Sequence, residues 1–195
     1  MRSNFLPRSR MSASAKPDQQ DILADDFWRY SVRLYGRPGV GENCLRLQDE
    51  AGVDVNVMLF CYWMGFRAAR SLSTEDVRGL LEATGDWREG AVKPIRCLRR
   101  KLKALTADTP GSGFVYDAIK RCELAAERVK QRLLVGAAGA MELMNSQSSD
   151  AAQVALANIG TYFAAQGVGE TDWVKAAVAA INNAAADLAK EETPN

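Results

Sequence analysis

One apolar run, Val57–Phe66, constrains the fold of this chain more than any other feature. Its ten residues are apolar or glycine, about half of the ~20 that a bilayer-spanning helix needs. A segment that is apolar on every side indicates a helix surrounded by other helices. Asp54 directly before it is a good N-cap, because its carboxylate can accept from the free amides of the first turn. The sequence therefore predicts a central buried helix from Val55 to about Arg70.

Apolar spacing is helical along nearly the whole chain, and strand-type alternation never persists beyond a few residues. We therefore predict an all-α fold, a compact multi-helix bundle of about five to six helices with an Ala-rich helical hairpin at its C-terminal end. Residues 20–144 form the predicted core domain, and residues 145–195 the hairpin and a short tail. Residues 1–144 carry a net charge of +5 and residues 145–195 of −4, so the hairpin either packs on the bundle or is tethered beside it. Residues 1–19 are expected to be a disordered extension, with translation starting at Met1 or Met11.

Two boundaries inside the core domain follow from local signals. Ser73 and Asp76 match a capping box, and the helix that they begin is expected to stop at Gly85. Pro94 suits the first turn of the next helix. The longest helix is predicted to run to about Met144 with an apolar face made of Val115, Ala118, Ile119, Cys122, Ala126, Val129 and Leu133.

The absence of histidine excludes several functions at once. It removes Ser–His–Asp and Cys–His activation, imidazole base catalysis and His-ligated metals. The four cysteines contain no C-x-x-C pair, so they read as small core residues rather than metal ligands. We expect no metal and no cofactor, and an enzyme is the less favoured class.

Polar residues before the apolar run allow two readings. Two carboxylates near aromatic walls can perform acid–base chemistry if burial separates their pKa values. The simpler reading makes Asp54 a helix cap and leaves Asp49 facing solvent, whereas Gln48 at the inner helix edge needs hydrogen-bond partners. The candidates for a ligand pocket are Trp28, Tyr35, Gln48, Asp49, Asp54, Tyr62 and Trp63.

A basic helix, residues 93–103, is the candidate interaction surface. It can contact phosphates or an acidic partner, or it can be solvated or paired internally with Glu123, Glu127 and the acidic tail. A net charge of +1 for the whole chain argues against a dedicated nucleic-acid binder. The candidate residues are Lys93, Arg96, Arg99, Arg100 and Lys103, of which the last four fall on one helical face.

A series of short motifs extends along the first two thirds of the chain. They are Trp28, Tyr35, "PGV" at 38–40, "CLRLQD" at 44–49, "GVDVNVMLF" at 52–60 and Trp63, with looser matches in "PIRCLRRKLK" at 94–103 and "ELAAER" at 123–128. This series resembles a family of small proteobacterial proteins that carry a domain of unknown function. The resemblance covers roughly residues 25–135 and implies a bacterial cytoplasmic protein, without an activity or a catalytic residue to transfer.

Three functions remain in view. The favoured one is a non-enzymatic interaction or adaptor module that uses the basic helix to hold a protein partner. The alternatives are a small-molecule binder or enzyme with a pocket near Gln48 and Asp54, and RNA or ribosome association through the basic helix. No membrane span is expected, and the sequence leaves the partner and the oligomeric state open.

Overall fold

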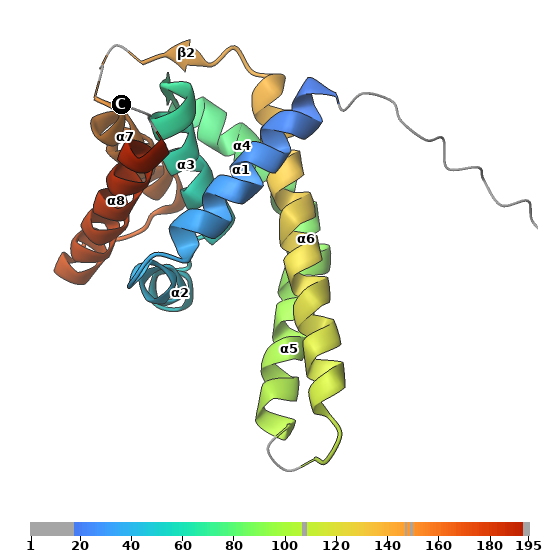
Figure 1. The fold of residues 1–195 in the computed structure, drawn as a ribbon. Coiled ribbons are helices and arrows are strands. Elements are labelled where there is room, and N and C mark those ends of the chain that lie inside the picture. The colour runs from blue at the N-terminus through green and yellow to red at the C-terminus, as the bar shows by residue number, and fades with distance from the viewer. Residues whose placement is uncertain (1–17, 107–108, 147, 149, 193–195) are drawn as a thin grey trace, which may run out of the picture.

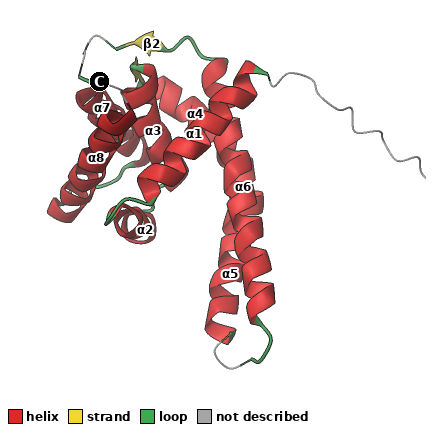
Figure 2. Cartoon of the chain, in the orientation of Figure 1, coloured by secondary structure: helices red, strands yellow, loops and turns green. Residues whose placement is uncertain are grey.

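The computed structural model describes residues 18–106, 109–146, 148 and 150–192. The choice between Met1 and Met11 lies outside these residues, as does nearly all of the predicted N-terminal extension. Within the described part, eight α-helices, one π-helical turn and one pair of short strands form the chain, so the all-α prediction is confirmed with a helix count slightly above the expected one (Figures 1 and 2). In chain order the elements are α1 (Gln19–Tyr35), α2 (Val40–Glu50), α3 (Val55–Ala68), β1 (Arg70–Ser71), α4 (Thr74–Trp87), η1 (Arg88–Val92), α5 (Lys93–Leu105), α6 (Gly113–Gly139), β2 (Met144–Asn145), α7 (Ala151–Gln166) and α8 (Asp172–Glu192).

Helix α3 is the central element, as the apolar run predicts. All ten residues from Asn56 to Gly65 are buried, and α3 contacts α1, α6, α7 and α8. Phe27 of α1 packs on Phe60 and Trp63, with ring centroids 5.2 Å and 5.4 Å away. The aromatic side chains of α3 are thus part of the hydrophobic core.

The C-terminal helices pack on this core instead of lying tethered beside it. Tyr162, Ile181 and Leu188 are buried in the same hydrophobic cluster as Phe60. Helices α3 and α7 approach so closely that a β-carbon added at Gly65 would lie 2.5 Å from the backbone nitrogen of Ala155. Only glycine therefore fits at this crossing.

Ion pairs fix the C-terminal end of α8 against the first half of the chain. Glu191 pairs with Arg37, and Glu192 pairs with Arg33 and Arg67. The expectation that the acidic tail balances the basic helix is therefore wrong for these two glutamates, because α8 ends beside α1 and α3.

The helix from Thr74 does not stop at Gly85, contrary to prediction. It runs through the π-helical turn η1 directly into α5 and forms one continuous rod. In the turn, the backbone N–H of Lys93 donates to the carbonyl of Arg88, five residues earlier. Pro94 explains the wider turn, because a proline ring clashes with the carbonyl four residues before it in a regular α-helix.

Helix α5 and the first half of α6 form an antiparallel hairpin that projects away from the rest of the molecule, whereas α4 packs in the core (Figure 1). No residue of α5 is buried, so the expectation of a compact bundle is wrong for this part. The predicted apolar face of α6 is also wrong in part, because Cys122, Val129 and Leu133 are exposed. Its buried residues are Glu123, Ala126, Lys130, Gln131, Leu134, Val135 and Ala138.

Two-residue strands are an element that the sequence did not predict. Arg70 pairs with Asn145 and Ser71 with Met144 in antiparallel register. In the described part of the chain, none of the helices combines the length and the apolar character that crossing a bilayer requires.

Candidate functional site

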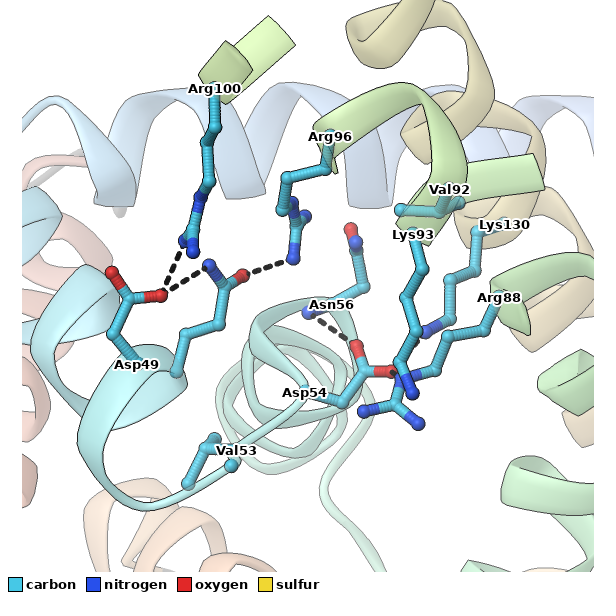
Figure 3. A pocket seen from close by; sticks show the side chains of 12 residues that line it. Asp49, Val53, Asp54, Asn56, Arg88, Val92, Lys93, Arg96, Arg100 and Lys130 are labelled. Atoms are coloured by element: carbon cyan, nitrogen blue, oxygen red, sulfur yellow. Dashed lines mark hydrogen bonds and ion pairs between the residues drawn. The ribbon is translucent and has the colours of Figure 1, made fainter. Parts of the chain in front are cut away.

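A pocket of about 320 Å³ lies where the rod passes α2 and the start of α3 (Figure 3). Helix α2 and the following loop supply one wall, the π turn and α5 supply the other, and α6 contributes Lys130. The lining residues are Gln48, Asp49, Gly52, Val53, Asp54, Asn56, Arg88, Val92, Lys93, Arg96, Arg100 and Lys130.

Asp54 has the structural role that the sequence predicts, and a second one. Its Oδ1 accepts from the backbone N–H of Asn56 at 3.2 Å, which caps α3. Its Oδ2 also pairs with Lys130 Nζ and lies 3.0 Å from Arg88 Nε. The Asp54 backbone N–H donates to the Tyr162 hydroxyl at 2.7 Å. Asp54 thus joins α3, α6, α7 and the π turn.

Lys130 is buried, with 1% of its surface exposed. Burial lowers the pKa of its ammonium group, and the Asp54 carboxylate opposes this shift. The next residue, Gln131, donates from Nε2 to Asn56 Oδ1 at 2.9 Å. Consecutive polar residues of α6 thus bind the first turn of α3, because buried polar groups need partners.

Arg96 is the centre of a second group of polar contacts beside the pocket. Its Nε donates to Glu123 Oε1 at 2.9 Å, and its two terminal nitrogens reach Gln48 and Glu127. Arg99 binds Glu123 from the other side. Burial raises the pKa of Glu123, but hydrogen bonds from Arg99 and Arg96 outweigh it and lower the pKa overall. At Glu127 burial prevails and raises the pKa.

Asp49 closes the pocket at its outer edge. Its Oδ1 accepts from Arg100 Nη2 at 2.5 Å and from Gln48 Nε2 at 3.3 Å (Figure 3). The hydrogen bond from Arg100 lowers the pKa of the Asp49 carboxyl. Gln48 has the partners that its position at the helix edge demands, Arg96 and Asp49.

The predicted pocket residues separate into two groups. Gln48, Asp49 and Asp54 come together in the lining, whereas the four aromatic candidates do not line this pocket. Tyr62 is buried and donates to the carbonyl of Val178 at 3.1 Å, and Trp63 donates to Asp26 at 2.9 Å.

The other two aromatic candidates lie on α1. Arg128 of α6 stacks over the ring of Trp28, with 5.6 Å between its guanidinium carbon and the ring centroid. The ring of Tyr35 lies against Gly41, and part of it is exposed.

The basic helix is largely paired within the molecule. Besides Arg96 and Arg99, Arg100 pairs with Asp49, and Lys93 lies 2.7 Å from Glu89. Lys103 is exposed and forms no ion pair with any described residue. Of the two alternatives for this face, internal pairing with Glu123 and Glu127 accounts for most of its arginines.

Sequence reasoning did not select Arg88, Lys130 or Gln131 as candidate site residues. The signal for Lys130 was present, because Glu123, Ala126, Lys130 and Leu134 repeat three and four residues apart on one helical face. A search restricted to apolar residues does not find such a mixed face. Among the described residues, no group of three or more Asp, Glu or Cys side chains is placed to hold a metal ion.

These observations define an all-helical protein with a basic pocket at the root of a projecting hairpin. A family model described as "Protein of unknown function (DUF2390)" matches residues 26–134, and the chain belongs to this family. The matched range agrees with the resemblance in the sequence and includes α2, α3, the π turn, α5 and most of α6. The comparisons found no matching curated protein and no matching solved structure.

Proposed function

We propose that this chain is a non-enzymatic interaction module that presents the α5–α6 hairpin to a partner protein. One observation carries the proposal: α5 is a strongly amphipathic helix without a buried residue, and it lies on a hairpin that projects from the core (Figure 1). An exposed apolar face of this kind marks a protein-binding surface.

Exposed apolar side chains gather on both helices of the hairpin. Leu98 and Leu105 lie seven residues apart on one face of α5, and Phe114 at the start of α6 is 75% exposed. Leu124 continues the exposed set on α6. Such side chains supply the buried centre of an interface.

The polar residues around them are mainly cationic. No ion pair with a described residue is formed by any of four exposed cations, Lys101, Lys103, Lys120 and Arg121. Asp117 is a nearby exposed carboxylate. An apolar centre with a basic rim fits a protein surface that is apolar with an acidic rim.

The sequence analysis assigned the partner contact to the whole basic helix, but Arg96, Arg99 and Arg100 are paired within the molecule. These arginines stiffen the hairpin and its root, because Glu123 accepts from both Arg96 and Arg99. The proposed contact therefore uses the leucines, Phe114 and the lysines near the tip. A pre-ordered hairpin loses little conformational entropy on binding.

Site-specific crosslinking tests the proposal. A photoreactive phenylalanine analogue at position 114 is expected to capture one protein species in cells, whereas the same analogue at Leu156, 41% exposed on α7, is not. With the captured protein purified, Leu105→Ser with Phe114→Ser is expected to weaken binding at least tenfold, and Lys101→Glu with Lys103→Glu severalfold. Leu156→Ser is the matched control.

Two outcomes reject this function. Equal capture from positions 114 and 156 would show that the hairpin has no preferred contact. A crosslinked species that nuclease treatment destroys, with affinity that falls steeply with salt, would favour RNA as the partner.

A further inference from the structure

We propose that the pocket between α2 and the π turn binds a small phosphate-bearing molecule. This goes beyond the proposed contact with a partner protein, which uses the far end of the hairpin. The inference rests on the charge of the lining, the unused donors, the π turn and the size of the pocket.

Cations dominate the pocket lining. Five cationic side chains line it, and two carboxylates, Asp49 and Asp54, oppose them. Each of the five cations forms an ion pair. Three of the partners, Glu89, Glu123 and Glu127, do not line the pocket. A low-dielectric concavity lined mainly by one sign of charge concentrates a ligand of opposite charge. The five cations are Arg88, Lys93, Arg96, Arg100 and Lys130.

Several donors remain unused. Arg96 commits three nitrogens to protein acceptors, so it serves as a fixed part of the frame. Among the described residues, Arg100 has one hydrogen-bond partner, Asp49, to which its Nη2 donates. Arg88 Nε pairs with Asp54 and its Nη1 donates to Glu89, whereas its Nη2 has no acceptor in the part of the chain that the structure describes. Planar guanidinium groups with spare N–H donors match the oxygens of phosphate.

The π turn brings two of these cations to one side. In a regular α-helix, residues five apart point roughly 140° away from each other, since each residue turns about 100°. The wider π turn, closed by the bond from Lys93 N–H to Arg88 carbonyl, brings both residues into the same lining. Single π turns inside α-helices occur frequently at functional sites.

The size of the pocket restricts the ligand. Its 320 Å³ lies at the lower end of the range for small-molecule sites. Arg88 of the π turn and Arg100 of α5 lie on the same wall, and their partners Asp54 and Asp49 lie on the opposite one (Figure 3). A volume of this size suits one phosphate group with a small organic substituent. A polynucleotide does not fit in this volume.

Calorimetric titration of the full chain tests the site, with inorganic phosphate, glycerol 3-phosphate and citrate as probes at constant ionic strength. We expect saturable one-to-one binding of the phosphate probes. Arg100→Gln is expected to weaken it about tenfold, because a charge-assisted hydrogen bond is lost. Asp49→Asn is expected to tighten it severalfold, because it frees Arg100 and removes a repelling charge.

Both variants break the same ion pair, so damage to the fold would change the affinity in the same direction for both. Arg128→Gln is the matched control, because the side chains of Arg128 and Arg100 are 50% and 51% exposed and each forms one ion pair with a described residue. Absent saturation with both phosphate probes overturns the proposal, as does tighter binding of citrate. Unchanged binding in Arg100→Gln overturns it too, and so does equal weakening in Arg128→Gln or in Asp49→Asn.

Discussion

Lys130 of α6 and Asp54 at the start of α3 form an ion pair that is buried on both sides, although 76 residues separate them in the chain. The pair joins the root of the projecting hairpin to the central helix. Charges taken out of water cost free energy, so this pair fixes how α6 sits on α3 more than it adds net stability.

Removing the cation of this pair is expected to destabilise the fold strongly. Lys130→Met leaves the Asp54 carboxylate buried with Arg88 as its remaining cation, and we expect a loss of about 3 kcal/mol in the free energy of unfolding. Denaturant titration measures it. Lys190→Met removes an exposed lysine and is expected to cost less than about 1 kcal/mol. Equal losses in both variants would contradict a structural role for the buried pair.

The crossing of α3 and α7 gives a second prediction. Gly65→Ala is expected to cost about 2 kcal/mol or more, because its β-carbon would overlap the backbone of Ala155. Gly160→Ala on α7 meets open space and is expected to be neutral or stabilising by up to about 1 kcal/mol. Thermal unfolding of the two variants compares them directly, and a smaller loss at position 65 than at 160 would refute this packing.

Thiol labelling gives a third prediction, of accessibility. Cys97 and Cys122 are exposed, whereas Cys44 and Cys61 are buried. Burial raises the pKa of Cys44 to about 12 and that of Cys61 further, so both thiols stay protonated near neutral pH. Iodoacetamide is expected to add two groups to the native protein, at Cys97 and Cys122, and four after denaturation. Intact mass followed by peptide mapping identifies the sites, and a native adduct at Cys61 would contradict the packing of α3.

Acid stability gives the fourth prediction, with opposite signs at two glutamates. The pKa of Glu123 is lowered in the fold, so its contribution is present above the ordinary pKa of 4.5 and is lost as pH falls through the lower folded value. Glu123→Gln is therefore expected to flatten the loss of stability on acidification.

Glu127 provides the control, because its folded pKa is raised. The folded state binds the proton more tightly than the unfolded state, so this group gains stability as pH falls toward 4.5. Glu127→Gln is expected to steepen the loss in that window. Urea titrations between pH 7 and 3 measure both slopes, and slopes that change in the same direction would contradict the assignment.

Local signals predicted the parts of the structure that local physics decides. The cap at Asp54 and the capping box of Ser73 and Asp76 depend on neighbours within three residues, and both are present. The buried central helix follows from the apolar run alone. Residues 48, 49 and 54 line one pocket for the same reason, since they surround the start of that helix.

The rest depends on partners far away in the chain. Neither Lys130 nor Gln131 has an apolar side chain, and their burial follows from Asp54 and Asn56 on another helix. Trp63 and Tyr62 looked like pocket walls because they follow Asp54 closely, but the turn of α3 directs them to α1 and α8. The π turn was hidden because Gly85 and Pro94 both resemble helix boundaries.

Helix α4, the π turn and α5 follow one another without a loop, so a tilt of the helix axis at the π turn moves the whole hairpin. Thirteen residues of α5 extend about 20 Å beyond the π turn, at 1.5 Å per residue. A tilt of roughly 5° at Arg88 therefore displaces Leu105 by about 2 Å, without a change anywhere in α5 itself. Because no loop between α4 and α5 absorbs such a tilt, a small rearrangement at the π turn produces a larger displacement at the tip of the hairpin.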